Sequence, residues 1–211
     1  MENTNTTLLS EVADYYSQKL AKYGETPLGV DWNGAEGQTL RFSQLSRIIQ
    51  DEDEQSSIID LGCGYGALLE YLNSKYSIAS YLGVDVSKDM VAAAQKCFHA
   101  IANARFILGT EPDSTSDFGF ASGIFNVRLG CSDDEWLNYL ETTLDVLDRT
   151  SRRGFAFNCL TSYSDEDKKR DYLYYADPCM LFDLCKVRYS PQVALLHDYG
   201  LYEFTLLVRK A

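Results

Sequence analysis

The chain has 211 residues, of which 45% are hydrophobic and 24% are charged. This length suits one domain rather than two, and this composition excludes an intrinsically disordered chain. Its 31 acidic residues outnumber the 19 basic ones, and the formal net charge of -12 argues against general binding to nucleic acid or to an anionic membrane surface.

The N-terminal segment gives no sign of export. MENTNTTLLSEVADYY lacks the basic start and apolar stretch of a secretion signal, and no run approaches the ~20 apolar residues of a membrane-spanning helix. The six cysteines are far apart in the sequence and the two histidines form no cluster. We therefore expect a cytoplasmic protein with reduced thiols and no metal site.

Residues 1–56 are expected to form a helical cap that belongs to the same domain as the rest of the chain. An apolar stripe from Leu8 to Leu20 predicts a first helix, and a second is expected near Leu40 to Ile49. A glycine-rich stretch, YGETPLGVDWNGAEGQ, lies between them. The run DEDEQ at 51–55 is typical of a solvated linker.

Residues 57–211 alternate between strand-like and helical patterns. The strand-like runs cover residues 57–63, 80–86, 104–109, 118–125, 154–160, 192–199 and 202–210. Caps mark three of the intervening helices: Ser87 can cap one, Ser132 with Glu135 forms a capping box, and Asp177 precedes a proline. Strands and helices in alternation predict an α/β fold with an open, mostly parallel sheet.

Two connections are too short for a crossover helix. The segment EPDSTSD after the third strand has room for a turn or two of helix at most. Only Gly200 and Leu201 separate the last two predicted strands, so these two must form an antiparallel hairpin. The prediction is a seven-stranded Rossmann-like sheet with an antiparallel last strand.

A glycine loop follows the first predicted strand directly. In IIDLGCGYG, Gly62, Gly64 and Gly66 allow the backbone to approach a ligand closely at the start of a helix. Their G-x-G-x-G spacing differs from the G-x-G-x-x-G of dinucleotide-binding loops. Asp85 ends the next strand, about twenty residues further on, where a carboxylate can accept hydrogen bonds from ribose hydroxyls. Together these features predict a nucleoside site.

At these residues the chain resembles the class I S-adenosylmethionine-dependent methyltransferases. IIDLGCGYG resembles the first motif of that family and YLGVDVS the second, while FILGT and FGFASGIFNV stand at the third and fourth positions. The likeness covers roughly residues 57 to 210. YGETPLGVDWNG, ASGIFNV and LLHDYGLYEF further resemble a bacterial subgroup of small-molecule methyltransferases whose substrates are not characterised.

The resemblance implies that S-adenosylmethionine is bound and S-adenosylhomocysteine produced. It places Asp85 at the ribose and Thr110 or Glu111 at the adenine amine, because this sequence has threonine where the family often has an acid. It assigns the remaining contacts as follows: Asp60, Gly62, Cys63, Gly64 and Gly66 at the methionine part, Val86 and Met90 around adenine, and Ala121, Ser122 and Phe125 below the sulfonium.

The acceptor side is less constrained by the sequence, because methyl transfer requires alignment more than a fixed catalytic motif. His197, with Tyr199 beside it, is the best candidate base, and the alternative, which the sequence favours slightly, is a structural histidine hydrogen-bonded beside Asp198. Arg41 either binds the methionine carboxylate or forms a surface ion pair. The candidate pocket residues are Trp32, Phe125, Asn126, Tyr174 and Tyr175, with loop packing as the alternative for the two tyrosines.

The sequence therefore favours a methyltransferase that acts on a small polar metabolite or a sugar-like precursor. One alternative is an NAD(P)-dependent oxidoreductase, which the loop spacing and the terminal hairpin disfavour. The other is a non-catalytic protein that retains a cofactor-binding fold. The sequence does not predict an oligomeric state.

Overall fold

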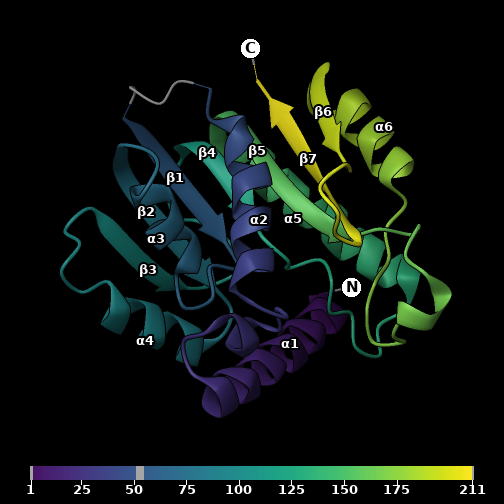
Figure 1. The fold of residues 1–211 in the computed structure, drawn as a ribbon, viewed down its shortest axis with the longest axis horizontal. Coiled ribbons are helices and arrows are strands. Elements are labelled where there is room, and N and C mark those ends of the chain that lie inside the picture. The colour runs from purple at the N-terminus through teal and green to yellow at the C-terminus, as the bar shows by residue number, and fades with distance from the viewer. Residues whose placement is uncertain (1, 51–54, 211) are drawn as a thin grey trace.

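A computed structural model describes residues 2–50 and 55–210, with the side chains of the first helix described from Leu8 onward. Seven strands form one sheet in the order β3-β2-β1-β4-β5-β7-β6 (Figure 1). Their bounds are β1 Ser56–Leu61, β2 Ile78–Asp85, β3 Ala104–Leu108, β4 Ser116–Ala121, β5 Ser151–Leu160, β6 Gln192–Leu196 and β7 Glu203–Arg209. Six strands run in one direction, and β7 runs antiparallel to both of its neighbours, β5 and β6. This confirms the predicted sheet with an antiparallel last strand.

Helices cover both faces of this sheet. Their bounds are α1 Glu2–Tyr23, α2 Ala35–Leu45, α3 Ala67–Asn73, α4 Lys88–Cys97, α5 Asp133–Thr150 and α6 Pro178–Arg188, with short 3-10 helices at Pro27–Val30, Ser46–Ile48 and Glu166–Lys168. One apolar core joins α2, α3 and α4 to one face, and a second joins α5 and α6 to the other. The central strands β1 and β4 are largely buried and consist mostly of apolar residues, whereas the edge strands β3 and β6 are partly exposed.

Local signals in the sequence start the helices as expected. Ser87 accepts a hydrogen bond from the backbone N–H of Met90, and Ser132 forms a complete capping box with Glu135. Asp177 accepts bonds from two backbone amides at the start of α6. Each cap satisfies amides that the first turn of a helix leaves unpaired.

The connections differ from the prediction in two places. The second helix begins at Ala35 rather than near Leu40, because α2 starts within the glycine-rich stretch. Residues 109–115 link β3 to β4 without a helix, within the limit of a turn or two that their length set. The hairpin loop spans residues 197–202, longer than expected, because β6 already ends at Leu196. The predicted linker at 51–55 lies outside the described residues except for Gln55.

The N-terminal elements cover one edge and one face of the sheet. Figure 1 shows α1 lying across the edge at which the parallel strands end, while α2 packs against the face in front of β5 and β7. Tyr15 and Lys19 of α1 donate hydrogen bonds to Asp31 at 2.6 and 2.5 Å, which ties α1 to the segment before α2. Chain order reverses between β1 and β4, the position at which open α/β sheets bind ligands.

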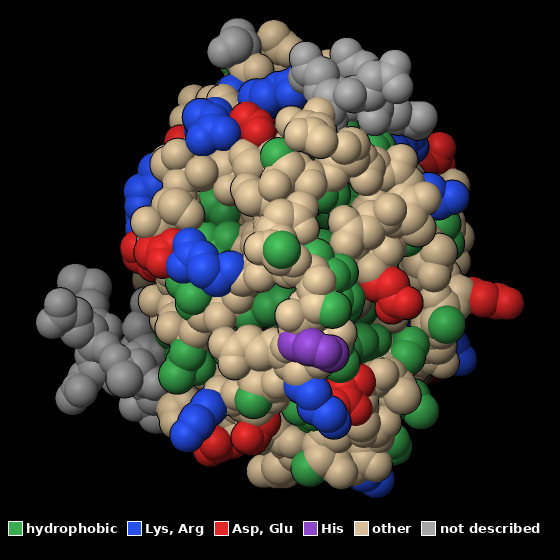
Figure 2. All heavy atoms as spheres, turned by 90° about the vertical axis from the view of Figure 1, so that its left-hand side faces the viewer, with side chains coloured by type: hydrophobic (Ala, Val, Ile, Leu, Met, Phe, Trp, Pro, Cys, Tyr) green, Lys and Arg blue, Asp and Glu red, His purple; other side chains and the backbone are tan. Residues whose placement is uncertain are grey.

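The surface on the side of β3 and α4 carries charges of both signs. Figure 2 shows basic and acidic side chains scattered there among uncharged ones, without a continuous basic area. Within the described residues, no helix has both the length and the apolar character that crossing a membrane requires. All six cysteines are unpaired.

Candidate active site

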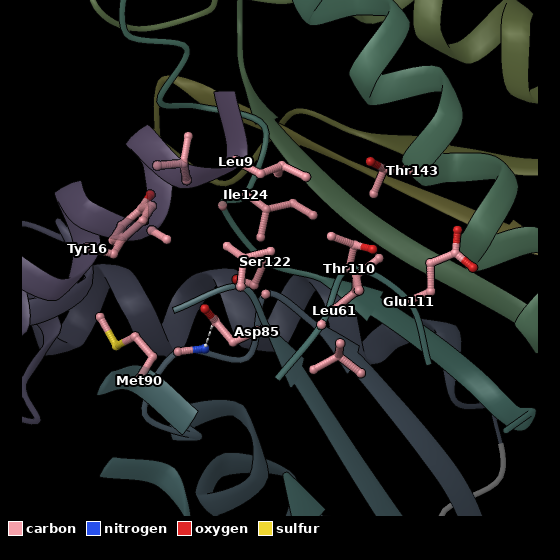
Figure 3. Close-up of a pocket in the computed structure, with 18 of the residues that line it drawn as sticks. Leu9, Tyr16, Leu61, Asp85, Met90, Thr110, Glu111, Ser122, Ile124 and Thr143 are labelled. Atoms are coloured by element: carbon pink, nitrogen blue, oxygen red, sulfur yellow. Dashed lines mark hydrogen bonds between the residues drawn. The ribbon is translucent and has the colours of Figure 1, made fainter. Parts of the chain in front are cut away.

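A cavity of about 630 Å³ lies at the carboxyl edge of the sheet, between the strand ends and α1 (Figure 3). Its walls come from α1, the segment before α2, the glycine loop after β1, the ends of β2 and β3, the turn after β4, and α5. A smaller recess adjoins it and shares Val30, Trp32, Gly62, Gly64 and Ser122 with it. The cavity therefore lies where the chain order of the sheet reverses.

The glycine loop turns the chain sharply from β1 into α3. Gly62, Gly64 and Gly66 have φ values of 75°, 54° and 89°, which glycine adopts without strain. A Cβ atom on Gly62 would lie 2.0 Å from a methyl group of Ile124 in the cavity wall. Gly62 and Gly64 line the cavity as predicted, whereas Gly66 caps α3 and packs beside Phe98.

Asp85 connects this loop to the end of β2. Its carboxylate accepts hydrogen bonds from the backbone N–H groups of Gly64 and Ser87, both at 2.8 Å, and the first of these is drawn in Figure 3. Burial raises the pKa of the Asp85 carboxyl, and the same backbone amides oppose that shift. The carboxylate is thus fixed in the wall of the cavity by the loop itself.

Asp60 lies in the smaller recess and is almost completely buried. The hydroxyl of Tyr81 donates a hydrogen bond to one carboxylate oxygen, while the other oxygen has no partner among the described residues. Burial raises the pKa of Asp60 to about 7, although the bond from Tyr81 acts in the opposite direction. An unpaired oxygen of this kind suits a donor supplied by a ligand.

Thr110 and Glu111 both line the cavity after the end of β3. Glu111 also forms an ion pair with Arg149 of α5 at 2.5 Å, with both side chains about half exposed. Val86 and Met90, at and after the end of β2, also line the cavity. The alternatives that the sequence left open for the adenine contact therefore both remain available.

The turn after β4 supplies the centre of the site. Ser122, Gly123 and Ile124 line the cavity, and within the part of the chain that the structure describes the buried hydroxyl of Ser122 has no hydrogen-bond partner. Ala121 is fully buried in the strand end and does not reach the cavity, which corrects its predicted role. Cys63 lines only the smaller recess.

Comparison with known sequences identifies the family. A family model described as "Methyltransferase domain" matches residues 58–150. Rv1506c of Mycobacterium tuberculosis (strain ATCC 25618 / H37Rv), provisionally named a methyltransferase, is 64% identical over 155 residues, which cover 74% of this chain and 93% of that protein. The chain belongs to the methyltransferase family.

Solved structures show that this methyltransferase has the class I fold. A DhpI complex with SAH superposes with a TM-score of 0.65 at 16% identity, covering 97% of each chain. The magnesium protoporphyrin IX methyltransferase ChlM of Synechocystis PCC 6803, solved with bound SAM, gives a TM-score of 0.58 at 15% identity over 83% of this chain and 80% of its own. The predicted fold class and enzyme class are confirmed, and the oxidoreductase alternative gains no support.

Four residues predicted to line the methyltransferase's substrate pocket do not reach the cavity. Because β4 ends at Ala121 and Gly123 turns the chain at a φ of 78°, Phe125 points into the core between Tyr139 and Phe157. The neighbouring contacts are equally structural: Asn126 accepts a bond from Leu160 N–H at 3.1 Å, Tyr174 is buried in the same core, and the hydroxyl of Tyr175 accepts from Arg170 N–H at 2.9 Å. Trp32 does line the cavity.

His197 and Tyr199 also lie apart from the cavity. Since β6 is the outermost strand and ends at Leu196, the alternation that would turn both side chains inward does not continue into the loop. The exposed ring of His197 lies beside Tyr163 and Phe204, and the hydroxyl of Tyr199 bonds to Thr205 Oγ1 at 3.0 Å.

Arg41 has a different partner from the one that the resemblance suggested. Its guanidinium donates two hydrogen bonds to the carboxylate of Glu203, at 2.8 and 2.6 Å. Both side chains are largely buried, so the pair is not the surface ion pair that formed the alternative. Gln38 and Tyr65 instead present polar atoms to the recess that contains Asp60.

Sequence reasoning missed the residues that α1 and α5 contribute. From α1 come Leu9, Ser10, Val12, Ala13 and Tyr16, and from α5 come Tyr139, Thr142, Thr143 and Val146. In α1 the apolar stripe carried the signal, but a stripe does not distinguish core packing from a cavity wall. In α5 the adjacent threonines interrupt an apolar helix face next to Leu140 and Leu144, which was a usable hint.

Proposed function

We propose that this methyltransferase binds S-adenosylmethionine in the cavity and transfers its methyl group to a small polar molecule that carries no negative charge. The observation that carries the proposal is the buried carboxylate of Asp85, held beside the glycine loop by the amide of Gly64. In this position a carboxylate can accept hydrogen bonds from both ribose hydroxyls, while the loop leaves room for ligand against its backbone.

The residues present fit this cofactor on two further grounds. The unpaired oxygen of Asp60 supplies an acceptor for the cofactor's ammonium group, next to the open backbone of Gly62 and Gly64. The end of β3 offers Thr110 and Glu111 to the adenine amine, and Val86 and Met90 offer apolar contact to its ring. We therefore assign the methionine part of the cofactor to Asp60 and the glycine loop, its ribose to Asp85, and its adenine to the residues that follow β2 and β3.

The charges around the cavity disfavour an anionic acceptor. Among the described residues, the cavity wall includes two carboxylates, Asp85 and Glu111, and no lysine, arginine or histidine. A phosphate or carboxylate on the acceptor would be desolvated here without a positive partner, which is costly. Hydroxyl groups of Ser10, Ser122 and Tyr16 and the ring of Trp32 in the cavity wall support a polar metabolite or a sugar-like precursor.

Bound S-adenosylmethionine supplies a methyl group on a positively charged sulfur, and the protein has to align the acceptor with it. Ser122 lines the cavity beside Gly123, and its small side chain leaves room for an in-line approach. The acceptor atom gains the methyl group and releases its proton, and S-adenosylhomocysteine leaves. We assign the rate acceleration to this alignment, since no described histidine lines the cavity.

Location and partners follow from the same properties. The six unpaired cysteines suit a reducing compartment such as the cytoplasm. The net charge of -12 opposes association with nucleic acid, so we propose a small molecule as the partner.

Calorimetry of the purified protein with S-adenosylmethionine, S-adenosylhomocysteine and NAD tests the proposal directly. We expect saturable binding of the first two ligands and none of NAD. Binding of NAD alone would support an oxidoreductase instead, and absence of binding for all three would favour a non-catalytic role.

A further inference from the structure

A buried ion pair joins the cap to the sheet beside the active site. Arg41 of α2 donates from Nε and Nη2 to the two carboxylate oxygens of Glu203, at the start of β7. The Glu203 side chain is 1% exposed and that of Arg41 11%, so both charges are largely removed from water. Removing one partner of such a pair leaves an uncompensated buried charge, so the contact resists opening.

Hydrogen bonds through Asn158 link Glu203 to Gly123 in the cavity wall. The side-chain amide of Asn158 in β5 donates to Glu203 Oε2 at 2.7 Å. Its carbonyl oxygen accepts a hydrogen bond from the backbone N–H of Gly123 at 2.9 Å. Asn158 is fully buried and both ends of its amide are therefore used. The conformation of the turn after β4 is thus coupled to the position of Arg41.

Trp32 contacts both ends of this network, Arg41 and Gly123. The Arg41 guanidinium lies 3.9 Å from the centroid of the indole, a distance at which the cation attracts the ring face. The ring also covers Gly123 so closely that a Cβ atom there would lie 2.3 Å from Trp32 Cζ2. Trp32 borders both the main cavity and the smaller recess. Its ring is therefore held between a fixed cation and the turn that carries Ser122.

We propose that Arg41, Glu203 and Asn158 are positioning residues that hold the indole of Trp32 as a fixed wall of the active site. The wall limits how far an acceptor can extend beside Ser122, so Trp32 determines acceptor size. This role rests on the proposed function, because the wall selects an acceptor only if a methyl donor occupies the cavity. A guanidinium bound at two points offers the ring a rigid platform, which a flexible lysine would not. The cap is then closed before any ligand binds.

Fluorescence of Trp32 tests this arrangement in the ligand-free protein. The chain has two tryptophans, so Trp136→Phe leaves Trp32 as the only indole. In that background we compare Arg41→Gln, Arg41→Lys and Glu203→Gln with Arg188→Gln, which removes an ion pair between α6 and α5 far from the cap. If Trp136→Phe does not fold, subtracting the signal of a Trp32→Phe partner from each variant isolates the same indole.

We expect a red-shifted emission maximum and stronger acrylamide quenching in the three variants at Arg41 and Glu203, and neither change in Arg188→Gln. The emission maximum and quenching of Arg41→Lys should lie between those of the parent and Arg41→Gln, since lysine keeps the positive charge but lacks the planar guanidinium that supports the ring. Far-UV circular dichroism and thermal unfolding establish that each variant is folded. Unchanged quenching in folded Arg41→Gln and Glu203→Gln would show that the network only stabilises the fold, which overturns the proposal.

A failure of this fluorescence test can be distinguished from a failure of the proposed function. Titration of the parent with S-adenosylhomocysteine tests cofactor binding, and its failure would leave the ligand-free fluorescence comparison intact. Where the parent binds, we expect the ligand to protect Trp32 from acrylamide in Arg188→Gln but less so in Arg41→Gln. Equal protection in both would also contradict a positioning role.

Discussion

Replacement of Asp85 by alanine should separate ligand binding from folding at this site. The carboxylate accepts two backbone hydrogen bonds at 2.8 Å, from Gly64 and Ser87, and both amides lose their acceptor in the variant. Hydrogen bonds to a charged group contribute about 1.5 to 3 kcal/mol each, and the burial cost of the carboxylate offsets part of that gain. We therefore expect a loss of stability of about 2 kcal/mol.

Asp85→Ala should also weaken the binding of S-adenosylhomocysteine, because the ligand loses its ribose contacts in addition to the support that Asp85 gives to the glycine loop. Loss of the ribose contacts is worth about 1 to 3 kcal/mol, which corresponds to roughly 5-fold to 150-fold in the dissociation constant. Isothermal titration calorimetry at a temperature where the variant is fully folded measures this directly. Wild-type affinity in folded Asp85→Ala would refute the assignment of the ribose site.

Asp117 provides a matched control at the opposite edge of the sheet. It accepts bonds from the backbone N–H and the hydroxyl of Ser57 at 2.8 and 2.6 Å, near the start of β4, and pairs with Arg152. Asp117→Ala should lower the melting temperature and leave the dissociation constant for S-adenosylhomocysteine unchanged. A similar loss of affinity in both variants would mean that stability alone controls binding.

Four further substitutions, with Gly130→Ala as a control, test individual parts of the site. Gly64→Val should abolish binding in calorimetry, because φ is 54° and a Cβ would lie 3.0 Å from Val30 Cγ1, whereas Gly130→Ala, with nothing within 4 Å of its Cβ, should bind normally. His197→Asn should leave ligand affinity and melting temperature almost unchanged, and a large loss of methyl transfer would restore its role as a base. Thr110→Val and Glu111→Gln should differ in affinity for S-adenosylhomocysteine, and the weaker binder identifies the adenine contact.

The parts of the fold that could be predicted from sequence are those with local causes. The capping box at Ser132 and the cap at Asp177 involve residues within one helical turn, so their spacing alone reveals them. The glycine loop and Asp85 were also predictable, because the ends of adjacent parallel strands meet at one edge of the sheet.

The parts that could not be predicted depend on contacts between distant segments. Arg41 and Glu203 are 162 residues apart, and no pattern near either residue indicates the pairing. Phe125 was placed in the pocket on the assumption that its strand continued, but the strand stops at Ala121 and the ring turns into the core. The cavity surfaces of α1 and α5 likewise arise only when both helices pack around the strand ends.

Asp60 gives the site a pH dependence whose sign follows from its burial. Burial raises the pKa of this carboxyl from an ordinary 3.8 to about 7, so between these values the folded protein holds a proton that the unfolded chain has lost. Stability should therefore fall as the pH rises through this window, by about 4 kcal/mol in total for a shift of this size. Asp60→Asn should remove that slope in urea unfolding measured at several pH values, whereas Asp117→Asn should retain it.

Ligand binding should release the proton that Asp60 takes up on folding. An ammonium group beside Asp60 favours its charged form, so its pKa falls and a proton is released when S-adenosylhomocysteine binds. At pH 6 the ligand's own amino group is already protonated and contributes no proton change. Calorimetry in buffers of different ionisation enthalpy should then give different apparent binding enthalpies for the wild type and equal ones for Asp60→Asn. Affinity should rise with pH up to about 7, by at most ~10-fold per unit. Equal enthalpies for the wild type in all buffers would place the ammonium group away from Asp60 and remove this residue from the binding site.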